Sequence, residues 1–199
     1  MCELLSPATR GDVEIDYVTI TEHQAHLCNL RSAMHRDRWG HVSTGCYVRL
    51  SIGGDLVMTD TDMERLTNST VIRKAHGNVF IAGLGVGMIL VPILAKGEVQ
   101  SVTVIEKNQN VIDLILPQLT KTLNGTALKL RVERGDAFTW KPIRGTKFDI
   151  VYFDIWPDRC VDNLEQVAKL HQRAKFWLNR SNPNAWMGSW FEEELKALK

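Results

Sequence analysis

The pattern of hydrophobic and polar residues is most regular in the middle of the chain. The apolar run Val79–Ala82 has the length of a buried strand, and a glycine-rich turn follows it. About ten apolar residues then predict a helix that ends at Gly97, and Val102–Ile105 predicts a second strand. Glu106 stands at the end of that strand. This order predicts half of a nucleotide-binding βαβ unit.

The alternation of strands and helices continues toward the C-terminus. Lys129–Glu133 and Phe148–Phe153 predict a third and a fourth strand. Asn163–Leu178 has apolar residues at helical spacing, with Asn163 and Gln166 placed as capping residues. Strands that alternate with helices form parallel sheets, so the sequence predicts an α/β protein with a Rossmann-like sheet.

The N-terminal part has a different pattern. Val13–Ile20 predicts a strand, and Thr21–Met34 predicts an amphipathic helix with Thr21 and Gln24 as a capping box. Two short strands around a Gly-Gly-Asp turn predict a β-hairpin between Cys46 and Thr59. We expect Asp60–Asn68 to be a loop that leads into the first βαβ strand. The chain therefore divides into an N-terminal helix and β-hairpin extension (1–70) and a Rossmann-like domain (71–199).

The spacing of the glycines indicates the kind of nucleotide. Gly83, Gly85 and Gly87 form G-x-G-x-G, whereas a dinucleotide site needs its third glycine one residue later, where Met88 stands. Glycines let the backbone pass close under a ligand, and this spacing resembles that of turns that bind an adenosyl ligand without a pyrophosphate. The carboxylate of Glu106 can accept hydrogen bonds from both hydroxyl groups of a ribose.

The ends of the third and fourth strands carry further candidates for the site. Asp136 can accept a hydrogen bond from an adenine amino group, and the backbone N–H of Ala137 is available for a ring nitrogen. Asp154 ends the fourth strand, where a transferred group would lie. Trp156 either stacks on a flat substrate or fills space at the sheet edge. Asp158 is a weaker candidate for the acceptor site, because it suits a cap or the surface better.

These motifs resemble the class I S-adenosylmethionine-dependent methyltransferases over about residues 75 to 158. Within that superfamily the nearest resemblance is to spermidine synthases, which share the strand that ends in Glu, the G-D-G/A turn and an N-terminal hairpin. Short methyltransferase-like proteins of phages and bacteria are similar too. The resemblance implies S-adenosylmethionine, or its decarboxylated form, as the ligand, and Asp154 as the proton acceptor. Spermidine synthases hold the ligand's amine with an acidic residue where this chain has Val86.

Three functions follow from the resemblance and the residues. The leading hypothesis is a methyltransferase that acts on a small acceptor, with Asp154 as its general base. The second is aminopropyl transfer to a polyamine, which the loss of an acidic residue at Val86 weakens. The third is a subunit that binds an adenosyl ligand without catalysis.

The C-terminal part is short for this fold. Methyltransferase sheets have three more strands after the fourth, but here Ala185–Trp190 can supply one short strand and Glu192–Lys199 a helix. The sequence thus predicts a C-terminally truncated sheet whose fourth strand is an exposed edge unless something covers it. The cover can be the N-terminal hairpin, the cluster of Trp177, Trp186 and Trp190, or another subunit. We expect a two-fold homodimer to cover that edge, through the region of Trp186 and Trp190 or through the hairpin at Tyr47–Asp60.

Composition narrows the class of protein. An apolar content of 44% and a charged content of 24% are ordinary for a soluble globular domain. The formal charge of +1 does not support nucleic acid as a partner, and no signal peptide or membrane span stands out. The four scattered cysteines predict free thiols and a cytoplasmic location. We expect no metal site, because His23, His26 and Cys28 lack paired spacing and a fourth ligand.

Overall fold

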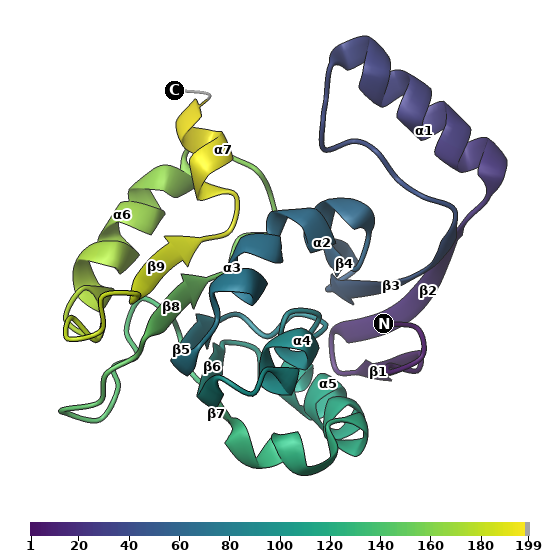
Figure 1. Cartoon of the computed structure of the whole chain (residues 1–199). Helices are drawn as coiled ribbons and strands as arrows, with labels where there is room; N and C mark the ends of the chain where they lie inside the picture. The colour runs from purple at the N-terminus through teal and green to yellow at the C-terminus, as the bar shows by residue number, and fades with distance from the viewer. Residues whose placement is uncertain (198–199) are drawn as a thin grey trace.

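The computed structural model describes residues 1–197, and a parallel sheet forms its centre (Figure 1). Within these residues the sheet has five strands in the order β7-β6-β5-β8-β9, and all neighbouring pairs are parallel. The strands are β5 (Gly77–Ala82), β6 (Val99–Glu106), β7 (Leu130–Arg134), β8 (Ile150–Phe153) and β9 (Trp186–Ser189). This order has the strand reversal of a Rossmann-like sheet, between β5 and β8, which confirms the predicted fold class.

The central strands are buried because both faces of a parallel sheet are covered by helices. All four residues of β8 are buried. Phe80 of β5 is the centre of an aromatic cluster with Trp140, Phe148, Phe153 and Trp177, at centroid distances between 5.1 and 6.0 Å. The core of the protein therefore lies along β5 and β8, directly under the strand ends that carry the candidate site.

One of the helices around the parallel sheet is shorter than the sequence predicted. These helices are α4 (Leu90–Ala95), α5 (Gln109–Thr122), the 3-10 helix η1 (Asn124–Lys129), α6 (Asn163–Ala174) and α7 (Glu192–Ala197). The helix after the glycines has six residues instead of about ten, because it begins late, at Leu90, which places Pro92 in its first turn.

Helices α6 and α7 are both present at positions that the sequence predicted. The predicted capping of α6 by Asn163 and Gln166 is wrong: Asp162 occupies the N-cap position, and Gln166 accepts a hydrogen bond from Trp156. The last two residues of the predicted Glu192–Lys199 helix lie outside the described residues.

The N-terminal part forms a second, antiparallel sheet in the order β1-β2-β3-β4. Its strands are β1 (Ala8–Arg10), β2 (Val13–Ile20), β3 (Gly45–Ile52) and β4 (Asp55–Thr59). The predicted strand and hairpin are thus confirmed. Helix α1 (Glu22–His35) connects β2 to β3 and extends away from the body of the molecule (Figure 1). Both hydrogen bonds of the predicted capping box at its start are present.

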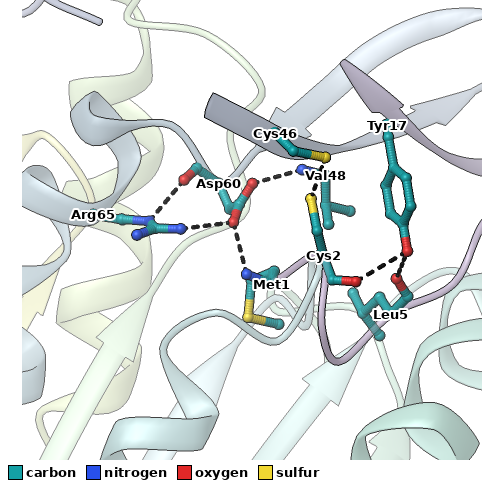
Figure 2. Close-up of polar contacts among 8 residues, drawn as sticks. All are labelled: Met1, Cys2, Leu5, Tyr17, Cys46, Val48, Asp60 and Arg65. Carbon is teal, nitrogen blue, oxygen red and sulfur yellow. Dashed lines mark hydrogen bonds and ion pairs between the residues drawn. The ribbon is translucent and has the colours of Figure 1, made fainter. Parts of the chain in front are cut away.

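The segment predicted as the loop Asp60–Asn68 is largely helical. It contains α2 (Asp62–Thr67), which α3 (Ser69–Lys74) follows directly, so the proposed domain boundary at residue 70 falls inside a helix. Asp60 lies just before α2, and its side chain is fully buried. Its carboxylate accepts hydrogen bonds from the Val48 N–H at 2.6 Å and from the Arg65 guanidinium at 2.9 Å (Figure 2). The loop prediction is wrong. The same carboxylate also accepts a hydrogen bond from the N-terminal amino group of Met1 at 3.1 Å across 59 positions, a contact for which the sequence has no local signal.

The fourth strand of the fold, β8, is not an exposed edge. β9 pairs with it in parallel register from Ile150↔Trp186 to Phe153↔Ser189. Trp190, which follows β9, is 4% exposed, so it is packed inside its own chain. The short predicted strand is therefore confirmed, and the expectation that the β8 edge needs a second subunit is wrong. None of the helices in the described residues has the length and apolar character needed to cross a membrane.

Candidate active site

A cavity of about 690 Å³ lies at the carboxyl ends of the central strands, where open α/β sheets bind their ligands. Strands β3 and β4 and helix α2 contribute its other walls. Seven residues that the sequence predicted for the site line this cavity: Gly83, Gly85, Glu106, Asp136, Ala137, Asp154 and Trp156. The structure thus gathers nearly all of the predicted site residues in one place, although they come from four strand ends.

The glycine turn follows β5 with left-handed backbone conformations that favour glycine. Gly83 has φ +100°, and a Cβ there would overlap the carbonyl oxygen of Asp154. Gly83 therefore lets the end of β5 contact the end of β8. Gly87 differs from the prediction, because a Cβ at this position would meet Leu119 of α5. Its role is the packing of the turn on a helix, and it does not line the cavity.

Glu106 connects the glycine turn to the end of β6. Its Oε2 accepts the N–H of Leu84 at 2.9 Å, and its Oε1 accepts the N–H of Asn108 at 2.8 Å. These bonds fix the orientation of the carboxylate at the wall of the cavity. Each carboxylate oxygen has a second lone pair, so both oxygens can still accept a hydrogen bond from a hydroxyl group.

Asp136 and Ala137 lie at the end of β7. Asp136 accepts the N–H of Phe138 at 2.8 Å and forms an ion pair with Lys107 at 3.0 Å. The hydrogen bond from Phe138, followed by the interaction with Lys107, lowers the pKa of Asp136. Asp136 therefore remains an anionic acceptor at neutral pH, and the buried Ala137 lies beside it at the cavity wall.

Asp154 lies at the end of β8 and is held by Asn68. Burial raises the pKa of Asp154 to about 7, although a hydrogen bond from Asn68 lowers it. Asn68 is itself fully buried: its Oδ1 accepts the Tyr152 hydroxyl at 2.9 Å, and its Nδ2 also lies 3.1 Å from the Glu64 carbonyl oxygen. A carboxyl group with a pKa near neutrality is suited to accept a proton during catalysis.

Glu64 of α2 is a site residue that the sequence prediction missed. It lines the same cavity as Asp154. Burial, and then the charge of Asp154, raise the pKa of Glu64 to about 8. The sequence carries a weak signal for its helix, with acidic residues in the first turn and Arg65 in the last. It carries no signal that this helix faces the end of β8.

Trp156 and Asp158 have different surroundings. The indole of Trp156 is 9% exposed, lines the cavity and donates to Gln166 Oε1 at 3.0 Å. Asp158 accepts the Asn163 amide at 3.1 Å, which ties its loop to the start of α6. It lies on an adjoining cavity of about 430 Å³, which shares Glu64, Pro157 and Trp190 with the main cavity.

The free protein should lose stability as the pH rises from about 5 to 9, and Glu64→Gln should reduce that loss. The pKa of Glu64 is about 8 in the fold against an ordinary value of 4.5, so between these values the folded state holds a proton that the unfolded state has released. This contribution to the free energy of unfolding is fully present below pH 4.5 and is lost as the pH rises through about 8. Thermal unfolding at pH 5 and pH 9 measures this difference.

The matched control for that experiment is Glu165→Gln. Glu165 is exposed on α6, where it pairs with Lys169. We expect a small effect of similar size at both pH values. A Glu64→Gln variant that follows the pH dependence of the parent protein would contradict the burial of an ionisable carboxyl group at this position.

The candidate metal ligands of the sequence do not converge. His23, His26 and Cys28 lie on α1, and among the described residues no three His, Cys, Asp or Glu side chains form a group that could hold a metal ion.

Comparisons with known proteins give partial similarities. No family model matches the chain. It is 32% identical over 123 residues to polyamine aminopropyltransferase 1 of Streptomyces coelicolor, a match that covers 56% of this chain and 22% of that protein. The chain therefore spans less than a quarter of this relative's length.

Among solved structures, the fold is similar to two methyltransferases. They are CcbJ from Streptomyces caelestis (13% identity, TM-score 0.44, 63% of this chain and 46% of that one) and the N-methyltransferase NodS from Bradyrhizobium japonicum (12%, 0.47, 63% and 66%). Because these similarities are low, the function has to be argued from the site.

Proposed function

We propose that the protein is an S-adenosylmethionine-dependent methyltransferase that acts on a small acceptor. The observation that carries the proposal is the single cavity that joins the glycine turn and Glu106 to Asp154. Its volume of about 690 Å³ lies in the range of small-molecule sites. The cavity has hydrogen-bond acceptors for a ribose and an adenine, and no phosphate needs to be held at the turn.

The residues of this site fit an adenosyl ligand. Glu106 would accept the two ribose hydroxyl groups, and Asp136 with the Ala137 N–H would hold the adenine edge. When bound, S-adenosylmethionine supplies a methyl group on a sulfonium centre, which needs little further activation. The task of the chain is to hold the nucleophile of the acceptor in line with that carbon and to exclude water.

Asp154 would remove the proton of the attacking group. Its pKa of about 7 allows it to be ionised at neutral pH and still to take up a proton. Asn68 would fix the carboxylate, because its Oδ1 accepts the Tyr152 hydroxyl and its Nδ2 can donate to Asp154 as well as to the Glu64 carbonyl oxygen. Glu64 beside it would ionise on binding an acceptor that brings a positive charge, such as an amine, because that charge lowers the raised pKa of Glu64.

Calorimetry with S-adenosylmethionine tests this proposal first. Binding of S-adenosylmethionine and of its demethylated product, followed by methyl transfer to members of a panel of small amines, would support it. Absence of binding for every adenosyl ligand would contradict it.

Aminopropyl transfer is the second candidate. The similarity to polyamine aminopropyltransferase 1 favours it, as does the pair of carboxyl groups at Asp154 and Glu64. Against it stands Val86, which is fully buried and cannot hold an amine at the turn. Tighter binding of decarboxylated S-adenosylmethionine, with an aminopropylated diamine as the product seen by mass spectrometry, would select this function. Binding without any turnover would select the third hypothesis, a non-catalytic subunit.

We also retain the proposals of a homodimer and of a cytoplasmic location. The dimer now rests on α1, which exposes Leu27, Leu30 and Met34 at helical spacing, with exposed fractions of 51%, 51% and 75%. Light scattering at micromolar concentration should give a dimer for the parent protein and a monomer for Leu27→Ser with Leu30→Ser. A monomeric parent protein would refute the proposal.

A further inference from the structure

Two of the four cysteines face each other at the N-terminal sheet. Cys2 and Cys46 are 44 positions apart in the chain, yet their Sγ atoms are 2.9 Å apart (Figure 2). Cys46 lies on β3, which is paired along its whole length with β2. The pair is outside the candidate active site, and none of the functions proposed above uses it.

The segment that carries Cys2 is held in place by several contacts. The Tyr17 hydroxyl of β2 lies 3.1 Å from the carbonyl oxygen of Cys2 and 2.5 Å from that of Leu5 (Figure 2). Leu5 is 1% exposed and belongs to the main core. Because both thiols sit on fixed backbone, their approach is a property of the fold and needs no rearrangement to occur.

The two thiols differ in their surroundings. Cys46 is exposed, whereas Cys2 is half-buried. Burial, and then the hydrogen bond with Cys46, raise the pKa of Cys2 to about 11. A thiolate is the attacking species in disulfide exchange, so the exposed Cys46 is the better group to react first with a reagent from solution.

We propose that Cys2 and Cys46 form a reversible intramolecular disulfide, with a small-molecule disulfide such as oxidised glutathione as the oxidant. The Cys46 thiolate attacks one sulfur of the oxidant, and a mixed disulfide forms as the first glutathione thiolate leaves. The Cys2 thiol releases its proton to water and attacks the Cys46 sulfur, which releases the second glutathione. Two protein thiols are oxidised, and one disulfide is reduced to two thiols.

The product would tie the N-terminal segment to β3. Leu50 and Ile52 on the same strand line the main cavity, so the cross-link would fix a segment against a sheet that forms part of the cavity wall. A disulfide that bridges 44 positions removes conformational freedom mainly from the unfolded chain. In a reducing compartment such an accessible disulfide forms reversibly and responds to the redox state.

Peptide mapping tests the proposal directly. The full chain is incubated with mixtures of oxidised and reduced glutathione, its remaining thiols are alkylated, and it is digested with trypsin without reduction. We expect one cross-linked species that joins the peptide ending at Arg10 to the peptide ending at Arg49. Cys28 and Cys160 should be alkylated throughout, and the intact protein should lose two hydrogen atoms without forming a covalent dimer.

Variants and thermal unfolding provide the controls. Cys28→Ser with Cys160→Ser should form the cross-link like the parent protein, whereas Cys2→Ser or Cys46→Ser should not. Oxidation should raise the Tm of the parent protein by roughly 5–10 °C, and dithiothreitol should reverse the rise. The Cys46→Ser variant should show no such rise. Full alkylation of Cys2 and Cys46 in oxidised glutathione alone, or cross-links that involve Cys28 or Cys160 instead, would overturn the proposal.

Discussion

Asp154→Asn should lower turnover by about a hundredfold or more and leave the affinity for S-adenosylmethionine nearly unchanged. Asparagine keeps the size of the side chain and its hydrogen bond with Asn68, but it cannot take a proton. In the parent protein turnover should rise with pH through about 7, because Asp154 must be ionised to act as a base. The variant should lose this dependence. Steady-state rates between pH 5.5 and 9 and calorimetric titration measure the two parts of the prediction.

Asp158→Asn is the matched control for that experiment. Asp158 lies on the same loop, but its carboxylate accepts the Asn163 amide at the start of α6. We expect its turnover to stay within a fewfold of the parent rate. Equal losses in the two variants would point to disturbance of the loop, and an unchanged rate in Asp154→Asn would exclude Asp154 as the base.

The site residues that could be predicted from the sequence are those with a local sequence signal. The apolar runs of β5, β6 and β8 and the glycine turn fix which residues stand at strand ends, and the ends of parallel strands lie at one edge of a sheet. For this reason Glu106, Asp136 and Asp154 could be assigned to one cavity before the structure was known. The same logic did not indicate that Gly87 packs against Leu119 of α5, because this contact has no local signal.

Glu64 shows what sequence reasoning could not find. Its helix has six residues, which is too short for a clear hydrophobic period. The place of this helix depends on contacts between distant residues, such as the Tyr152–Asn68 bond across 84 positions and the Trp190–Thr67 bond across 123 positions. The sequence did predict the short strand β9, but not its pairing with β8, which lies more than thirty positions earlier.

Glu106 has a proposed role in binding and an observed role in the structure. The predicted role is to hold the ribose, and the second is to accept the N–H groups of Leu84 and Asn108. Both roles would use the same two carboxylate oxygens of Glu106. A loss of affinity in a variant of Glu106 can therefore come from the missing acceptors or from a displaced turn, and an experiment has to separate these causes.

Glu106→Ala should weaken the binding of S-adenosylmethionine by about 2–4 kcal/mol, because two charge-assisted hydrogen bonds to the ribose are lost. The variant should also be less stable, since the N–H groups of Leu84 and Asn108 lose their partner. Glu106→Gln keeps one acceptor oxygen and the shape of the side chain, so its affinity should lie between those of the other two proteins. Calorimetric titration and thermal unfolding of all three measure both effects.

Glu133→Ala is the control for a carboxylate on the neighbouring strand. Glu133 lies on β7, where it accepts the Trp140 indole N–H at 3.1 Å and pairs with Arg131. Its removal should cost stability and leave the affinity unchanged. If Glu106→Ala binds the ligand as tightly as the parent protein does, the adenosyl site cannot lie at the end of β6, and the proposed function fails with it. If Glu106→Ala and Glu133→Ala lose affinity equally, the loss reflects stability and the ribose contact remains unsupported.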